Sequence, residues 1–370
     1  MRIAILTFHR AYNCGAMLQA WALKTVLERM GHTVEFPACN SVGVTERWRY
    51  PVVHSGKSGL AWFRSAVGRS LINLLSVPSE DILRHRYKVF RERYIPERRC
   101  LPADFNKHYD LIIVGSDQVW NEDLLQNDAP MFFGENLPTD VYRIVYAASY
   151  GDLPLAENKI KRVVGALENF SAISVREKLA KDQLAAFSNI SITETLDPTL
   201  LLDAADYDEI ACGSFQSEPY LFMYTLSTES FFVDTAKALA GKLGVRCVIA
   251  PCHQYSRFGA PRGLTYGLSP DRLVQYVRNA KYVITNSFHG TVMSVVFNKP
   301  FLSLRGQVDA FESRPASLLR KIGAIERLVN PTVSVDDMLL RLISSPLVNL
   351  NMIGEMRSES MAWLEEAVRL

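Results

Sequence analysis

Short apolar runs alternate with segments of helical period along most of the chain. In the first half these runs include RIAILTF at 2–8 and DLIIVG at 110–115, and in the second half YLFMYTL at 220–226 and KYVIT at 281–285. Apolar runs of this length, separated by helices, are typical of parallel strands that are covered on both faces. The pattern predicts an α/β protein with parallel sheets flanked by helices. The remaining predicted strands are 33–36, 143–148, 172–175, 192–196, 245–250 and 300–304.

The clearest helical pattern covers residues 15–30, and Gly31 follows it where a helix C-terminus favours glycine. The chain of 370 residues is too long for one ordinary core. The acidic and turn-rich stretch 203–219 separates two series of strands. We therefore predict an N-terminal domain at 1–205 and a C-terminal domain at 206–370. Further helices are predicted at 177–187, 230–243, 269–279 and 289–298.

Residues 47–79 interrupt the alternation of strands and helices. They contain arginine and lysine but no acidic residue, and the apolar positions of GLAWFRSAVGRSLINLL recur near helical spacing. A basic amphipathic helix can lie on an anionic membrane. The alternative is an outer helix or lid whose apolar face packs on the domain. The sequence leaves both interpretations open.

Composition and charge exclude several classes of protein. With 48% hydrophobic and 22% charged residues the chain is ordinary and globular, and its net charge of +2 gives no overall field that favours nucleic acid. The six cysteines are scattered without a CxxC pair, so neither a disulfide framework nor a metal site is expected. The N-terminal sequence lacks the pattern of a signal peptide, and no apolar run reaches 18 residues. We expect a cytoplasmic protein.

Polar residues follow the first predicted strand, where ligands bind in open α/β sheets. The segment TFHRAYNCGAML at 7–18 places Asn13 and Gly15 at the start of a helix, whose free N–H groups suit an anion. The spacing matches neither GxGxxG nor a Walker loop, so an ordinary strand-to-helix turn explains it equally well.

A second polar turn is ITNSFHGT at 284–291. His289 can give or take a proton near neutral pH, and Gly290 allows a ligand to approach the backbone. The alternative is a capping turn in which Ser287 caps the helix and His289 is a hydrogen-bonded bystander.

Charged residues follow other predicted strands. Arg176 follows the strand 172–175 and opens the helix 177–187. Its guanidinium matches a carboxylate or phosphate in a bidentate manner, although arginine at a helix start often only covers surface. Ser116 and Asp117 end the strand 110–115. Arg305 and Arg314 follow the strand 300–304 and would gather positive charge near His289 if the two strands are neighbours.

The turn Asp197-Pro198 also ends a predicted strand. The fixed φ of proline stops a strand, so Pro198 is interpreted as structural, while the sequence leaves open whether Asp197 has a purely structural role as well.

Five motifs taken together resemble the polysaccharide pyruvyl transferase family. They occur in the expected order over about 290 residues of the chain, and their combination is far more specific than any one motif. The resemblance implies two Rossmann-like domains that face each other across a cleft, the arrangement called GT-B. The motifs are NCGAMLQ at 13–19, LIIVGSDQVWN at 111–121, AISVRE at 172–177, LDPTLLL at 196–202 and ITNSFHGTVMSVVFNKPF at 284–301.

The same resemblance implies a reaction. Members of the family transfer the enolpyruvyl carbons of phosphoenolpyruvate to two hydroxyls of a sugar as a ketal and release phosphate, with no separate cofactor. The family's arginine in S-x-R falls on Arg176 and its histidine in S-F-H-G on His289. We expect His289 to be the general acid, and Arg176 with Arg305 or Arg314 to hold the anionic donor. Further substrate-binding residues are expected at Asn13, Gly15, Ser116, Asp117, Ser287 and Gly290.

One departure from the family is Asn286, which stands where many members have Asp and removes a carboxylate partner for His289. The expected acceptor is a nucleotide-, lipid- or oligosaccharide-linked sugar of cell-surface polysaccharide. Under the membrane-binding interpretation, the basic segment 47–79 would meet this acceptor at the inner face of the membrane.

Two other functions remain open. A GT-B glycosyltransferase would use a nucleotide sugar and could hold its ribose with Asp309 or Glu312. A non-catalytic glycan- or anion-binding protein has only Asn286 in its favour, and the fold alone does not decide between these functions.

Overall fold

The computed structural model describes residues 1–38, 82–125, 129–151, 154–211, 218–227, 229–252, 264–265, 267–305, 313–330, 332–345 and 347–369. The predicted basic segment 47–79 and the residues Asp309 and Glu312 lie outside these ranges.

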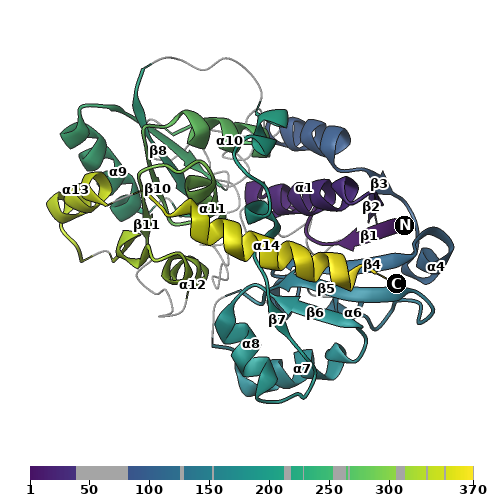
Figure 1. Ribbon diagram of the computed structural model, residues 1–370. Coiled ribbons are helices and arrows are strands. Elements are labelled where there is room, and N and C mark those ends of the chain that lie inside the picture. The colour runs from purple at the N-terminus through teal and green to yellow at the C-terminus, as the bar shows by residue number, and fades with distance from the viewer. Residues whose placement is uncertain are drawn as a thin grey trace, which may run out of the picture.

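Two parallel sheets organise the described chain (Figure 1). The first sheet has seven strands in the order β3-β2-β1-β4-β5-β6-β7 among the described residues, and every pairing is parallel. Its strands are β1 (Arg2–Leu6), β2 (Thr33–Pro37), β3 (Glu97–Arg98), β4 (Leu111–Asp117), β5 (Tyr142–Ala148), β6 (Ala172–Val175) and β7 (Thr193–Glu194).

The second sheet is formed by later residues of the chain. Within the described ranges it has five parallel strands in the order β12-β11-β10-β8-β9. Its strands are β8 (Tyr220–Thr225), β9 (Arg246–Pro251), β10 (Tyr282–Thr285), β11 (Phe301–Leu304) and β12 (Leu328–Val329).

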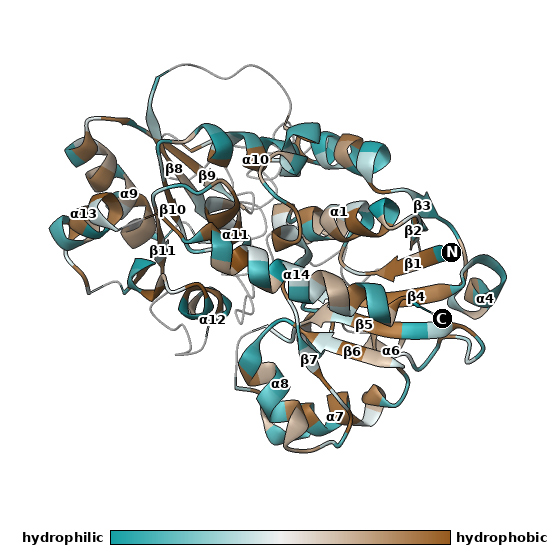
Figure 2. Ribbon diagram, in the orientation of Figure 1, coloured by the Kyte–Doolittle hydropathy of each residue, from teal (hydrophilic) through white to brown (hydrophobic). Residues whose placement is uncertain are grey.

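Helices cover both sheets. Figure 2 shows that the strands are mostly apolar and that the helices that cover them have one apolar and one polar side. The helices pack on the sheets because this buries the apolar side chains of both. The helices of the first part of the chain are α1 (Cys14–Arg29), an unlabelled helix at 82–94, α4 (Phe105–His108), α5 (Glu122–Leu125), α6 (Ala129–Phe132), α7 (Glu157–Leu167) and α8 (Lys178–Ala185). Those of the second are α9 (Ser230–Leu243), α10 (Pro270–Asn279), α11 (Phe288–Val296), α12 (Arg314–Lys321), α13 (Val335–Ser344) and α14 (Leu350–Ala367). Short 3₁₀ turns occupy η1 (Pro102–Asp104), η3 (Pro198–Leu200), η4 (Asp206–Glu209) and η5 (Ile325–Arg327).

The strand order reverses once in each sheet. In the first sheet the chain moves outward from β1 to β3 and returns on the other side of β1 with β4. In the second it moves from β8 to β9 and returns on the other side of β8 with β10. Loops at the carboxyl ends of such strand pairs diverge and leave space for a ligand. The fold thus places the loops after β1, β4, β8 and β10 at two binding edges.

Helix α1 shows how local sequence sets its ends. Asn13 caps its start by accepting hydrogen bonds from the backbone N–H groups of Gly15 (2.9 Å) and Ala16 (3.2 Å). At its end Gly31 has a φ of +87°, and the N–H of His32 bonds to the carbonyl of Leu27 at 3.1 Å. This arrangement closes a helix with a left-handed residue, as the sequence predicts at Gly31.

Hydrophobic packing joins the two domains. A single cluster of buried side chains includes residues from the first sheet, α1, the second sheet, α10 and α11, while separate clusters fill the outer faces of the two sheets. Trp21 of α1, for example, packs on Tyr207 in the segment that links the sheets, with ring centroids 5.2 Å apart.

The last helix, α14, returns to the first sheet, so that both chain ends lie beside it (Figure 1). Arg357 of this helix donates hydrogen bonds to the carbonyls of Leu200 (2.8 Å) and Leu202 (3.0 Å), and Ser360 accepts one from the N–H of Leu196 (3.0 Å). Residues 350–367 are therefore packed on the N-terminal half of the chain.

Each predicted strand is present with small shifts of its ends, and the predicted helices begin or end within one or two residues of the observed ones. The two-residue strands β3 and β12 were not predicted, because so short a segment carries no periodicity. None of the described helices combines the length and the apolarity that crossing a membrane requires.

Candidate active site

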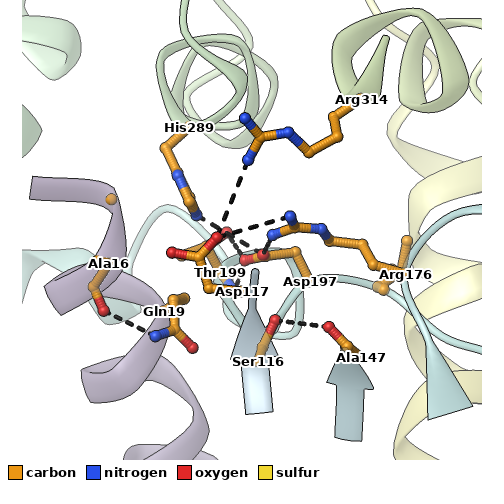
Figure 3. Close-up of polar contacts among 12 residues, drawn as sticks. Ala16, Gln19, Ser116, Asp117, Ala147, Arg176, Asp197, Thr199, His289 and Arg314 are labelled. Atoms are coloured by element: carbon orange, nitrogen blue, oxygen red, sulfur yellow. Dashed lines mark hydrogen bonds and ion pairs between the residues drawn. The ribbon is translucent and has the colours of Figure 1, made fainter. Parts of the chain in front are cut away.

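Charged side chains from both domains meet between the carboxyl ends of the two sheets (Figure 3). Asp117 ends β4, Arg176 follows β6 and Asp197 follows β7. His289 lies in the first turn of α11, and Arg314 is the first residue of α12. The sheets thus present carboxylates and one arginine from the first domain to a histidine and a second arginine from the other.

Arg176 is only 5% exposed and is surrounded by acidic groups. Its Nε donates to Glu177 Oε1 at 2.9 Å, its Nη1 donates to Asp197 Oδ2 at 2.6 Å, and its Nη2 lies 3.7 Å from Asp117 Oδ1. The guanidinium also stacks on the ring of Phe288 at 4.4 Å. Burial disfavours its charge, but the negative charges of Glu177, Asp197 and Asp117 outweigh burial and raise the pKa of Arg176 above its ordinary value.

Asp197 links Arg176 to His289. Its Oδ1 accepts hydrogen bonds from the N–H (3.0 Å) and the hydroxyl (2.5 Å) of Thr199, while its Oδ2 faces Arg176 and lies 3.6 Å from His289 Nε2. Burial opposes ionisation, but contact with His289, the charge of Arg176 and the Thr199 bond hold the pKa of Asp197 well below its usual range. A fixed anion therefore orients both the arginine and the imidazole.

His289 is buried at the junction of the domains. Ser287 caps α11 by accepting a hydrogen bond from the N–H of Gly290 at 3.4 Å, and this places the imidazole one residue inside the helix. Its Nε2 has no hydrogen-bond partner within the described part of the chain. Its other face lies against Gly15, where an added Cβ would overlap the ring. Glycine at the start of α1 is thus required for the histidine to reach its position.

We expect Gly15→Ala to displace His289 and to lower any activity that depends on it by about 100-fold, since a misplacement of about 1 Å in a reacting group has an effect of this size. Turnover and thermal midpoint should be measured together. Gly165→Ala is the matched control, because a Cβ added there meets nothing within 4 Å and should stabilise α7 by about 0.5–1 kcal/mol. Unchanged turnover in Gly15→Ala would show that the imidazole does not need this position.

Several predicted site residues have their side chains engaged in local structure. Asn13 caps α1 and so occupies the N–H groups that could bind an anion, and Ser287 caps α11. The Ser116 hydroxyl donates to the carbonyl of Ala147 at 3.0 Å. Gly290 lies where a Cβ would meet Thr285. Ser287 is thus the helix cap, as the structural interpretation of ITNSFHGT predicts, while the His289 imidazole faces the charged cluster.

Arg314 rather than Arg305 reaches this cluster. Its Nη1 lies 3.9 Å from Asp117 Oδ1, and its guanidinium lies 5.9 Å from the ring centre of Phe288. Arg305 follows β11, which is the neighbour of β10 as expected, but it does not line the pocket. The space at the cluster is about 10 Å³, room for one water molecule, so a larger ligand requires side chains to move. The pocket is lined by Arg176, Glu177, Leu196, Asp197, Leu200, Phe288, Arg314, Ser317, Leu318 and Lys321.

Asn286 stands where many family members have a carboxylate partner for the histidine, and in this chain another residue supplies that carboxylate. Asn286 accepts a hydrogen bond from the N–H of Leu226 at 2.7 Å and so joins the loops after β8 and β10. Asp197, whose role the sequence left open, supplies the carboxylate instead. Asp197 also follows a strand at the binding edge, and this position in the sequence could have identified it as a site residue. Glu177, Phe288 and Lys321 were likewise not predicted as site residues.

The chemistry of this arrangement follows from its charges. Arg176, Arg314 and Lys321 offer positive groups for an anion, and His289 offers a proton carrier next to them. Asp117 brings a buried carboxylate between the two arginines. No group of three or more His, Cys, Asp or Glu side chains in the described ranges could hold a metal ion. The site is suited to a small anionic substrate and to proton transfer.

Comparison with known proteins gives a family and a fold. The sequence profile of the polysaccharide pyruvyl transferase family matches residues 13–307, and Arg314 lies beyond that match. No curated protein matches the sequence significantly.

Solved structures similar to this chain include two UDP-GlcNAc 2-epimerases. The enzyme from Methanocaldococcus jannaschii, in complex with UDP-GlcNAc and UDP, is 12% identical with a TM-score of 0.54, and the alignment covers 99% of each chain. The enzyme from Neisseria meningitidis, bound to UDP-GlcNAc, is 14% identical with a TM-score of 0.52 over 99% of this chain and 100% of the other. At these identities the likeness concerns the fold alone. It confirms the predicted architecture of two Rossmann-like domains in a GT-B arrangement.

Proposed function

Because this chain belongs to the polysaccharide pyruvyl transferase family, we propose that it transfers the enolpyruvyl carbons of phosphoenolpyruvate to two hydroxyls of a sugar acceptor and forms a ketal. The acceptor belongs to cell-surface polysaccharide synthesis and is carried by a nucleotide, a lipid or an oligosaccharide. The observation that supports the proposal most directly is the joining of His289 to Arg176 through Asp197 at the meeting point of both sheets. The donor itself serves as substrate, with no separate cofactor.

The donor carries a carboxylate and a phosphate, which suit the two arginines. Arg176 and Arg314 lie on either side of Asp117 and both approach the ring of Phe288. Guanidinium groups bind both anions through charge-assisted hydrogen bonds, and the Nη2 of Arg176 lacks such a bond among the described residues. We assign Arg176 and Arg314 to donor binding.

The first chemical step is protonation of the methylene carbon of phosphoenolpyruvate. This leaves positive charge at C2, which a sugar hydroxyl then attacks, so a general acid must lie beside the donor. His289 is the proton carrier within this cluster, and its Nε2 lies 3.6 Å from Asp197 Oδ2. The nearby arginines can stabilise the departing phosphate.

Donor binding provides the direct test. Phosphoenolpyruvate at about 100 times its dissociation constant should stabilise the wild-type fold by about 2.7 kcal/mol. In Arg314→Gln the dissociation constant should rise about 10- to 100-fold, because a hydrogen bond to a charged group is worth about 1.5–3 kcal/mol. A thermal-shift titration of both proteins measures this, with UDP- and GDP-sugars titrated beside phosphoenolpyruvate.

Arg320→Gln is the matched control, since Arg320 lies on the same helix but is exposed and does not line the pocket. It should bind the donor like the wild type. Stabilisation by a nucleotide sugar alone would refute the proposal and indicate a glycosyltransferase. Stabilisation by neither class of donor would favour the non-catalytic alternative.

A further inference from the structure

Asp117 has an unsatisfied carboxylate oxygen inside the candidate site. The residue is 6% exposed, and its Oδ1 has no hydrogen-bond partner in the ranges that the structure describes. The nearest cationic groups, Arg176 Nη2 and Arg314 Nη1, are 3.7 and 3.9 Å away, too far for hydrogen bonds. Buried polar atoms normally have a hydrogen-bond partner. A buried oxygen without one therefore points to a ligand group that donates the hydrogen bond.

The backbone of Asp117 is also in an unusual conformation. Its φ is +77°, in the left-handed region that residues other than glycine seldom adopt. Its carbonyl accepts hydrogen bonds from the N–H groups of Val119 (2.7 Å) and Ser149 (2.9 Å), which hold the residue at the edge of the sheet. A residue kept here only for folding would more readily be glycine. The conformation directs the side chain into the cluster drawn in Figure 3.

The two proposed substrates differ in what they can offer this oxygen. The carboxylate and the ionised phosphate of phosphoenolpyruvate are hydrogen-bond acceptors, and a further carboxylate repels them. A sugar hydroxyl, in contrast, can donate a hydrogen bond to Oδ1. The Asp117 carboxylate therefore weakens binding of the anionic donor, and it is suited to accept a hydrogen bond from a hydroxyl of the acceptor.

We propose that Asp117 is the general base that takes the proton of the first attacking sugar hydroxyl, a role that rests on the proposed function. His289 gives its proton to the methylene carbon, the hydroxyl oxygen bonds to C2, and the hydroxyl proton passes to Asp117. The bond from C2 to the phosphate oxygen then breaks, and the phosphate leaves with the proton held by Asp117. The second hydroxyl attacks C2 and returns its proton to His289, so both residues regain their starting forms.

Two variants separate this role from a structural one. Asp117→Asn removes the negative charge and retains the shape, while Asp117→Gly suits the observed backbone and leaves space for a small acid. Both should lower turnover about 100-fold. Both should bind phosphoenolpyruvate as tightly as the wild type or more tightly, and the thermal midpoint of Asp117→Gly should be unchanged or higher. Turnover is measured as phosphate release with the sugar diol that the wild type converts fastest.

Formate provides a readout that packing would not affect. Added to Asp117→Gly at saturating donor, it should restore part of the turnover by replacing the missing carboxylate, while Asp117→Asn has no space for it. Asn298→Gly is the matched control, because Asn298 also has a positive φ (+45°) but lies beyond the far end of α11. It should remain fully active.

The outcomes distinguish the two proposals. If phosphoenolpyruvate does not bind the wild type, the proposed function fails, and the assignment of Asp117 fails with it. If the donor binds and either variant turns over at the wild-type rate, only the assignment of Asp117 is overturned. Weaker donor binding in both variants would also overturn it, because Asp117 would then belong to the donor site.

Discussion

Replacing His289 by glutamine should lower the turnover of phosphoenolpyruvate by about 10²–10⁴-fold, the usual contribution of a general acid. Glutamine keeps a polar group of similar reach beside Asp197 but cannot supply a proton to carbon. Donor affinity should change little, because the proposed anion-binding groups are Arg176 and Arg314. Phosphate release gives the turnover, and the thermal-shift titration gives the affinity.

The chain offers a matched histidine for comparison. His289 lies edge-on to Phe288 with ring centres 5.1 Å apart, and His108 lies edge-on to Tyr109 at 6.2 Å. His108 precedes β4 and so lies at the opposite end of the sheet from the site. His108→Gln should keep full turnover. A His289→Gln enzyme that works at the wild-type rate would exclude His289 as the acid.

The architecture was largely predictable from the sequence because parallel strands buried on both faces leave apolar runs that local pattern detects. The runs at 110–115 and 281–285 became β4 and β10, and the polar turns that follow them supply Asp117 and His289. The order of strands within each sheet could not be predicted from the sequence. β1 pairs with β4 and β8 pairs with β10, and these strands are far apart in the chain, so local patterns do not indicate the pairing.

The geometry of the site was less predictable, for physical reasons. The sequence cannot show that Asp197, 92 positions before His289, lies 3.6 Å from its imidazole. It also could not choose between Arg305 and Arg314, because that choice depends on where α12 begins relative to β11. Nor could it show that Asn13 satisfies the helix N–H groups that would otherwise bind an anion.

The candidate site is formed by the contact between the two domains. Asp197 faces His289, Asp117 faces Arg314, and Glu194 pairs with Lys321, in each case across the two sheets. Every one of these pairs sets an acidic residue of the first domain against a basic residue of the second. An anionic donor that enters between them competes with the carboxylates for the same cations. Donor binding and the contact between the domains are therefore coupled.

Asp197→Asn should be the most destabilising of the substitutions considered. Asparagine can still accept the hydrogen bonds of Thr199, but it leaves the buried Arg176 without its closest anion. Removal of one partner from a buried ion pair costs about 3–5 kcal/mol. Urea unfolding at pH 7 measures this loss. Asp182→Asn is the control, because Asp182 pairs with Lys178 on an exposed helix surface and its loss should leave the midpoint unchanged.

The loss of stability in Asp197→Asn should also depend on pH, and the direction of this dependence follows from the pKa of Asp197. Contact with His289 and Arg176 depresses the pKa of Asp197 in the folded protein below the unfolded value of about 3.9. Its ionisation thus stabilises the fold at pH values above about 4, and this contribution is lost as the pH falls through the folded value. The difference in unfolding free energy between wild type and Asp197→Asn should shrink as the pH falls below about 4. A difference that stays constant down to pH 2 would mean that Asp197 acts through its shape and hydrogen bonds, and that its charge does not hold Arg176 and His289 in place.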